Sequence, residues 1–457
     1  KSLLYTFAKA VNLRAMLSDV LPLTTRDLPV PDWGKLGEQL PIDWIESALK
    51  YTGKASIRQR RLPAEQVVWL VIALAIYRHR SVRQVLGELE LALPDLKDTC
   101  VTDSAVTQAR QRLGEEPLAW LFSTSARHWH AQDAQATDFH GLQLLAMDGT
   151  SLKLADSAEN RAHFDSPHFA KGALASYPHA RVVTLSVLRT QLFLAADFGA
   201  YSQGEMAFAL KLLDTVPDYS LTVFDRGFLA AELLHALCTK GKERHFLVPA
   251  KSNTRWRLVS GDEHDGIVEM NVSAAARKRD PTLPKQWQAR AIATTGPTGK
   301  PGYFLTSLTD RRRFTAEALR KCYRERWQIE TSYREIKQTM MGMALSLRSH
   351  SVAATRQEIW GILIAYNLVR LEMARTAHQA KCAPNDVSFV FALGVFQLEM
   401  MHAASERAQG NIPRTIRRMR ERMILELNVY RPGRKYERVA KAKPQRYPER
   451  RLRKPLT

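Results

Sequence analysis

The sequence predicts an α/β fold in which a mixed sheet with flanking helices follows a helical N-terminal region. The first observation is a change of hydrophobic period near residue 141, from helical spacing to the short apolar runs of buried strands. The second is the order of elements after that point: three strands, a helix, a strand, a helix and a strand. The third is size, because 457 residues with 45% hydrophobic content can form two or three domains.

The composition indicates a partner with many negative charges. Lys and Arg number 67 against 46 Asp and Glu, a formal net charge of +21. Such an excess favours binding to phosphate backbones, although a solvated basic surface is the alternative. The longest apolar run, 67–77, is shorter than the roughly 20 residues of a membrane span. Four widely spaced cysteines also exclude a paired zinc motif. We therefore expect a soluble, cytoplasmic protein with no membrane partner.

Residues 1–135 are expected to form a helical DNA-binding domain. Apolar residues recur at helical spacing in 44–49, 67–77, 82–91, 106–113 and 118–129. The basic residues among these segments include Arg60, Arg61, Arg110 and Arg112. Segment 104–113 is the best candidate for a helix that enters the major groove, where its arginines would reach bases or phosphates. A packing helix with a solvated arginine face explains the same pattern equally well.

Two aspartates follow apolar strands in the next region, residues 136–250. Run 142–147 ends in Asp148-Gly-Thr, and run 221–224 ends in Asp225-Arg-Gly. Further strands are expected at 182–188, 191–196 and 245–249, with helices at 206–213 and 229–237. We expect both aspartates at the carboxyl ends of their strands, the edge where α/β sheets bind ligands.

The pattern changes twice beyond residue 250. Turn signals and alternating apolar residues in 251–312 predict a β-rich insertion. Helical spacing then returns in 316–343 and 356–378, so we expect the second part of the core to cover 313–380. Two further helices, 389–405 and 413–427, are expected to form a C-terminal region, 381–430. The tail, 431–457, has eleven Lys or Arg, two Glu and four Pro. It cannot bury a core and is expected to contact DNA or to be disordered.

One predicted helix groups a carboxylate with a phenol and two cations. Tyr323, Arg326, Glu330 and Lys337 stand at offsets 0, 3, 7 and 14. At about 100° per residue these positions fall within about 60° of one another on the helix. A neighbouring apolar stripe that includes Ile329 can anchor the helix on the sheet. The alternative is a solvated helix with ordinary i,i+4 ion pairs.

This spacing resembles the signature Y-(2)-R-(3)-E-(6)-K of DDE transposases of bacterial insertion sequences, in the IS-four-like family. All four positions match without a gap, and the resemblance extends over roughly residues 41–447. It implies an RNase H-like catalytic core, with Asp148 on the first strand, Asp225 on the fourth, and Glu330 on a helix that follows the β-rich insertion. Trp327 also matches the family.

The resemblance implies a metal-dependent enzyme that cleaves transposon ends and joins them to target DNA. Asp148, Asp225 and Glu330 would hold two Mg²⁺ ions, with Mn²⁺ able to substitute, because carboxylates are the oxygen ligands that hard cations prefer. Asp148 would bridge the two ions. Water would be the nucleophile for cleavage, and the freed 3′-hydroxyl would be the nucleophile for strand transfer.

The resemblance also implies the partners. Tyr323, Arg326, Trp327 and Lys337 would contact DNA near the scissile bond, the arginine as a two-pronged donor and the lysine as a point charge. The double-stranded DNA would be the terminal inverted repeats and the target DNA. A homodimer is expected in the synaptic complex, associated with the bacterial nucleoid.

Two other functions fit part of this pattern. A catalytically inactive, domesticated transposase that acts as a regulator would use the basic helices but has no need of three carboxylates. A nuclease on the same core would use the carboxylates but not the long basic terminal regions. Related enzymes also stack a flipped base on an aromatic residue of the insertion. Trp256, Trp287 and Tyr303 are the candidates here, with core packing as the alternative.

Overall fold

The computed structural model describes residues 40–55, 62–89, 101–133, 138–168, 175–295, 299, 301–342, 346–405, 412–425 and 427. Arg60, Arg61 and the tail 431–457 lie outside these residues, so what was expected of them stays a prediction. Within these ranges no helix has the length and apolar content that crossing a membrane requires.

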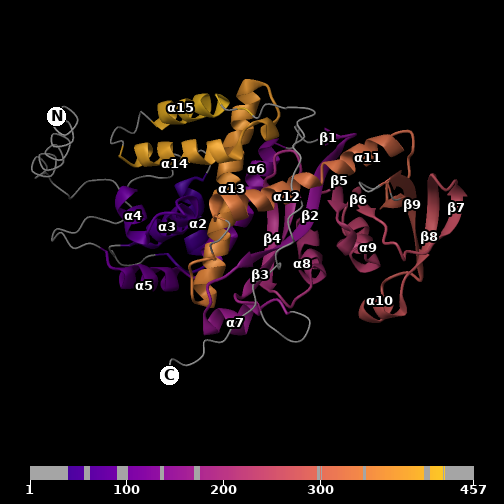
Figure 1. The fold of residues 1–457 in the computed structure, drawn as a ribbon, viewed down its shortest axis with the longest axis horizontal. Coiled ribbons are helices and arrows are strands. Elements are labelled where there is room, and N and C mark those ends of the chain that lie inside the picture. The colour runs from indigo at the N-terminus through magenta and orange to yellow at the C-terminus, as the bar shows by residue number, and fades with distance from the viewer. Residues whose placement is uncertain are drawn as a thin grey trace, which may run out of the picture.

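The N-terminal region is helical, as predicted. Its helices are α2 (Ile42–Tyr51), α3 (Ala64–Ile76), α4 (Val82–Glu88), α5 (Asp103–Leu113) and α6 (Glu116–Asp133). Pro63 precedes α3, where a missing backbone N–H costs nothing, and a capping box at Ser81 begins α4. The apolar helix α3 is buried from Gln66 to Ile76 because it packs against the long helix α13 (Val352–Ala380). The N-terminal helices are therefore part of one core with the C-terminal half of the chain (Figure 1).

The central sheet is a mixed sheet, as predicted for an RNase H-like core. Its strands are β1 (Asp138–Phe139), β2 (Leu142–Lys153), β3 (His179–Val187), β4 (Phe193–Ala200), β5 (Ser220–Phe224) and β6 (Arg244–Pro249). The spatial order is β4-β3-β2-β5-β6, in which β3 is antiparallel to its neighbours and β2, β5 and β6 are parallel. Strand β1 pairs with the beginning of β2.

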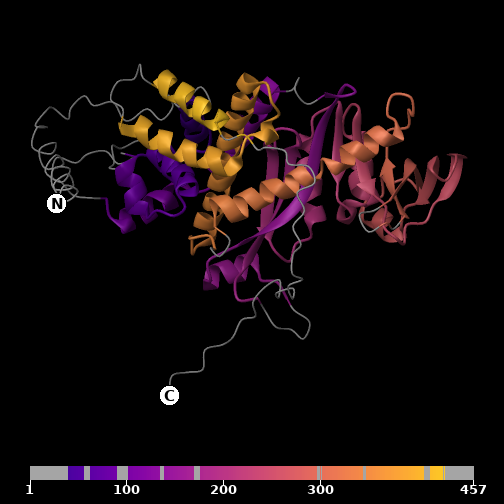
Figure 2. The ribbon, with the colours of Figure 1, turned by 45° about the horizontal axis from the view of Figure 1, so that its top comes forward.

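Alternation along β2 sends neighbouring residues to two separate cores. Leu144 and Ala146 face one core with α12 (Trp327–Arg334) and α13, while Leu145 and Met147 face the other with α8 (Glu205–Leu212) and α9 (Ala231–Thr239). Figure 2 shows α12 crossing one face of the sheet. By this alternation Asp148 belongs to the α12 face. Helix α7 (Ala158–Phe164) lies between β2 and β3 in the chain.

The β-rich insertion is an extension of the core sheet and not a separate unit. It contains β7 (Arg257–Gly261), β8 (Asp265–Asn271), α10 (Ala274–Arg279), β9 (Gln286–Thr295) and β10 (Pro301–Thr306). Strand β10 pairs antiparallel with β6, and β9, β8 and β7 follow in order, so one sheet runs from β4 to β7. The sequence indicated the strands but not this pairing, because turn signals give no information about long-range partners.

The C-terminal helices are α11 (Ala316–Arg324), α12, a π-helical turn (Glu335–Met340), α13, α14 (Phe389–Ser405) and α15 (Ile412–Ile424). The single helix expected over 316–343 is therefore wrong in detail. Three of the arginines of α15 pair inside the bundle: Arg418 and Arg422 with Glu399, and Arg420 with Glu372. Both glutamates are almost fully buried, so these pairs hold the C-terminal helices together.

Candidate active site

Strand pairing brings the two predicted aspartates together. The parallel pairing of β2 with β5 ends at Met147 opposite Phe224. Asp148 and Asp225 are the next residues on these adjacent strands. Each carboxylate accepts a hydrogen bond from a nearby backbone N–H: Asp148 from Gly149 at 2.8 Å and Asp225 from Gly227 at 2.6 Å. The Asp-Gly-Thr and Asp-Arg-Gly segments therefore orient their own carboxylates.

The expectation that Asp148 ends its strand is wrong. Strand β2 continues to Lys153, because β3 pairs with it as far as Lys153 opposite His179. Only the parallel neighbour β5 ends at this level. Asp148 is thus paired with β3 on one side and has no β5 partner on the other. Asp225, in contrast, precedes a short 3-10 turn, Arg226–Phe228.

The helical segment that carries the signature contains 3-10 hydrogen bonds before Glu330 and a π-helical turn after it. Backbone bonds from Glu325 to Cys322, from Arg326 to Tyr323 and from Ile329 to Arg326 span three residues, the pattern of a 3-10 turn. The π-helical turn follows from Glu335. An even spacing of 100° per residue therefore does not describe positions 323–337.

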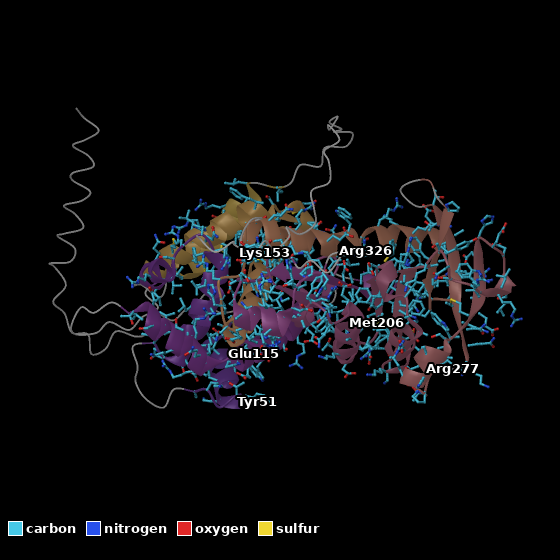
Figure 3. All side chains as sticks on the ribbon, turned by 60° about the horizontal axis from the view of Figure 1, so that its bottom comes forward. Tyr51, Glu115, Lys153, Met206, Arg277 and Arg326 are labelled. Carbon is cyan, nitrogen blue, oxygen red and sulfur yellow. The ribbon has the colours of Figure 1, made fainter. Side chains whose placement is uncertain are left out.

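Arg326 connects two of the three predicted carboxylates. Its guanidinium forms an ion pair with Glu330, four residues along the chain, and lies 3.5 Å from Oδ2 of Asp148. The side chain of Arg326 is 17% exposed and that of Asp148 is 13% exposed, so this contact is largely shielded from water. Figure 3 labels Arg326 among the side chains of this region, with Met206 of α8 below it in that view. Arg326 thus joins Glu330 to Asp148.

The electrostatics of the site favour a proton or a cation on Asp148. Burial raises the pKa of Asp148 to about 7, and the negative charges of Asp225 and Glu205 also raise it, while the Gly149 hydrogen bond and Arg326 lower it. Burial also raises the pKa of Tyr323, which lies near Arg326 and Asp225. The phenol of Tyr323 therefore keeps its proton at neutral pH.

The remaining signature residues flank this centre. Tyr323 packs its ring against Phe304 at 4.4 Å between ring centroids and lies under the Arg326 guanidinium. Trp327 is 59% exposed, which is unusual for so large an apolar side chain. Lys337 follows the start of the π turn and lines a small pocket with Thr150 of β2. Lys337 therefore lies near the part of β2 that follows Asp148 in the chain.

The arginines proposed for the N-terminal reading helix differ in position. The Arg110 guanidinium points inward, donating to Gln357 at 2.7 Å, to Ser349 at 3.2 Å and to the carbonyl of Ala354 at 3.1 Å. These bonds hold the Arg110 side chain against α13 and its N-terminal side, and the DNA contact predicted for Arg110 stays a prediction. Arg112 is exposed on the same helix, so its predicted DNA contact remains open.

The aromatic candidates of the insertion pack on the sheet. Trp256 contacts Tyr303 edge to face at 5.1 Å, and Trp287 lies 5.9 Å from Phe246. All three candidates are half-buried against the core on the α8 and α9 face. Core packing thus accounts for each of them.

Two supporting contacts were not predicted. The phenol of Tyr333, three residues after Glu330, donates to the main-chain carbonyl oxygen of Asp148 at 2.6 Å. On the other face, Glu205 packs closely on Gly149: a β-carbon at Gly149 would lie 2.4 Å from the carboxylate carbon of Glu205. The Glu205 carboxylate also pairs with Arg181. Spacing from Glu330 could have indicated Tyr333 as a helix-to-sheet contact. No local pattern pairs Glu205 with Gly149.

The donor chemistry fits a divalent cation. Asp148, Asp225 and Glu330 supply carboxylate oxygens only, the ligands of Mg²⁺ and Mn²⁺. Burial and the nearby carboxylates of Asp225 and Glu205 raise the pKa of Asp148, so its ionised form would gain from a bound cation. Across the part of the chain that the structure describes, no three His, Cys, Asp or Glu side chains gather closely enough to hold a metal ion. Asp148 and Glu330 share Arg326 instead.

Comparison with known proteins gives the family. Residues 31–123 match the model of the insertion element 4 transposase N-terminal region, and residues 139–368 match that of the transposase DDE domain. Transposase InsG for insertion sequence element IS4 of Escherichia coli (strain K12) is 35% identical over 415 residues, 90% of this chain and 93% of that protein. Putative transposase InsZ of the same organism is 35% identical over 246 residues, 53% of this chain and 81% of that protein.

A cryo-electron microscopy structure of a piggyBac transposase synaptic complex with hairpin DNA aligns at a TM-score of 0.43 and 11% identity, over 89% of this chain and 87% of that chain. The matches to both family models, which together reach from residue 31 to residue 368, confirm the resemblance inferred from the signature. DDE transposases generally use divalent metal ions. The chain belongs to the IS4 family of DDE transposases, enzymes of DNA transposition.

Proposed function

We propose that this transposase binds the terminal inverted repeats of an insertion sequence, cleaves the DNA ends at Asp148, Asp225 and Glu330, and joins the 3′-hydroxyls to target DNA. The observation that supports the proposal is the arrangement of these carboxylates: the aspartates follow paired residues on adjacent strands, and the glutamate is linked to Asp148 by Arg326. We also propose that the functional regions of the chain end at residues 135, 250, 312, 380 and 430.

The three carboxylates would hold two Mg²⁺ ions, with Mn²⁺ able to substitute. When bound, such ions supply Lewis acidity to the scissile phosphate and lower the pKa of the attacking water. The chain itself orients the ligands, because the backbone N–H groups of Gly149 and Gly227 fix one oxygen of each aspartate. The other oxygen of each aspartate would bind the cations, that of Asp148 after the Arg326 guanidinium, which lies 3.5 Å away, has moved.

Arg326 would change partners during this chemistry. A guanidinium shared by Asp148 and Glu330 has to release at least one of them before both can serve as ligands. Once released it is placed to donate two parallel hydrogen bonds to a phosphate. Tyr323, Trp327 and Lys337 would contact the same DNA strand from positions around it, Trp327 with its exposed ring.

DNA contacts away from the reaction centre would come from basic residues of the N-terminal region and the tail. Arg112 is exposed on α5. We propose that Arg112 contacts DNA, and that Arg60, Arg61 and residues 431–457 also do so. A homodimer would hold two ends in the synaptic complex. Because the substrate is DNA and the relatives are bacterial, we place the protein at the nucleoid.

The affinity for Mn²⁺ is expected to fall at low pH. A cation binds the ionised carboxylate, and the pKa of Asp148 is raised to about 7, so its proton competes with the metal below that pH. The apparent affinity should be about tenfold lower at pH 6 than at pH 8, since about one tenth of the group is ionised one unit below its pKa. Titration of Mn²⁺ followed by electron paramagnetic resonance of the free ion measures this. In Asp148→Asn the same pH dependence should be absent, and a wild-type affinity that does not change with pH would contradict this prediction.

Transposition on a plasmid separates the proposed function from its alternatives. The plasmid carries a marker between the DNA segments that border the gene on each side, and a second plasmid is the target. With Mg²⁺ the wild-type protein should excise the marker and produce covalent joints in the target. Cutting without joints would support a nuclease. Specific binding of the borders without cutting would support an inactive regulator.

A further inference from the structure

We propose that Tyr333 is a positioning residue that fixes the distance between Asp148 and Glu330 by tying the glutamate helix to the aspartate strand. The inference rests on the proposed role of these two carboxylates as ligands. Tyr333 itself touches neither carboxylate, so it would act only through the backbone of β2.

The phenol of Tyr333 contacts two neighbouring strands at the level of Asp148. It donates to the carbonyl oxygen of Asp148 at 2.6 Å, and its oxygen lies 2.7 Å from Oγ1 of Thr184. Thr184 is the cross-strand partner of Asp148 in the β2–β3 ladder. One hydroxyl of α12 therefore joins both members of the pair that contains the aspartate.

This contact is made where β2 has lost one of its neighbours. Pairing with β5 ends at Met147, so beyond that residue β2 is held in the sheet by β3. The Tyr333 phenol supplies a bond to the first residue past the last β5 pair. We infer that it limits movement of the Asp148 backbone in the part of the strand that β5 no longer supports.

The glutamate helix is held by the same side chain. The Tyr333 ring is 7% exposed and stacks on Phe193 of β4, with 6.0 Å between ring centroids and 26° between planes. A second bond, from Gln191 to Gln328 at 2.6 Å, holds the helix to the β3–β4 turn. Figure 2 shows α12 lying along this face of the sheet. Because Glu330 lies between these two anchors, its position along β2 depends on both.

The test is Tyr333→Phe in the full chain, because this change removes the hydroxyl and keeps the ring. Cleavage of a pre-bound end duplex should slow by about 10- to 100-fold, the usual effect of removing a group that orients a metal ligand. The Mg²⁺ concentration for half-maximal rate should rise, and Mn²⁺ binding should weaken. Affinity for the end duplex and the thermal unfolding temperature should stay close to those of the wild type. Thr184→Val, which leaves the bond to Asp148, should have a smaller effect.

Tyr77→Phe is the matched control. Its phenol is also buried and donates to a main-chain carbonyl oxygen at 2.6 Å, that of Gln397 in α14, away from the carboxylates. Tyr77→Phe should leave the rate and the Mg²⁺ dependence unchanged. A wild-type rate and Mg²⁺ dependence in Tyr333→Phe would overturn the proposal, and so would equal losses in the two variants. Normal cleavage by Asp148→Ala would instead overturn the proposed function.

Discussion

Replacing Asp148, Asp225 or Glu330 with Ala is expected to abolish end cleavage while leaving the affinity for end DNA nearly unchanged. Each change removes a carboxylate proposed to hold the metal, and losing one member of a catalytic unit lowers the rate by about 10⁴-fold or more. The groove and phosphate contacts of the N-terminal helices and the tail lie mostly elsewhere, so binding should persist. Single-turnover cleavage and a mobility-shift titration on the same end duplex measure the two quantities separately.

Asp218→Asn is the matched control for the aspartates. Asp218 precedes β5 as Asp225 follows it, and it pairs with Arg244 at 2.9 Å at the other end of the strand. This variant should cleave at the wild-type rate. If any one of the three alanine variants cleaves as fast as this control, that residue is not a ligand.

Arg326→Ala is expected to lower the cleavage rate at saturating DNA by about 10²- to 10³-fold, the effect of removing one donor to the charge that develops in a transition state. Affinity for the end duplex should fall much less, because many other cations contribute to binding. Arg326→Lys should recover only part of the rate, since an ammonium cannot reproduce the two parallel donors of a guanidinium. Lys337→Arg should be tolerated better, because it keeps a cation at a position proposed for a point charge.

Arg334→Ala separates this role from a general effect of helix charge. Arg334 lies on the same helix, is exposed and donates to the Thr331 hydroxyl at 3.2 Å. Its removal should leave the rate at saturating DNA unchanged. A wild-type rate for Arg326→Ala would mean that Arg326 serves only as an ion-pair partner of Glu330. An equal loss in Arg334→Ala would assign the effect to the charge of the helix as a whole.

The sequence predicted the parts of the site that depend on local spacing. Apolar runs located β2 and β5, and therefore Asp148 and Asp225, while the signature located Tyr323, Arg326 and Glu330. Pairing of Met147 with Phe224 then puts the aspartates on adjacent strands, whereas the apolar runs indicated only that the strands are separate. The family match confirms the resemblance, and with it the DDE transposase class.

Features that depend on long-range pairing were not predictable from one sequence. The extension of β2 past Asp148 requires its antiparallel partner β3, and the packing of Arg110 requires α13 beside α5. The break at Glu325 and the π turn at Glu335 change the helix within a segment whose periodicity looks continuous. Tyr333 looked like one more position on a charged helix, because its hydroxyl finds its partner 185 residues away in the chain.

The most direct measurement is the anomalous diffraction of Mn²⁺ in crystals of the protein with an end duplex. We expect manganese peaks among Asp148, Asp225 and Glu330, with the Arg326 guanidinium moved from at least one carboxylate to a phosphate of the DNA. Manganese bound elsewhere, or Arg326 still joining Asp148 to Glu330 in a complex that cleaves after Mn²⁺ is added, would contradict the assignment of the three carboxylates as the catalytic metal site.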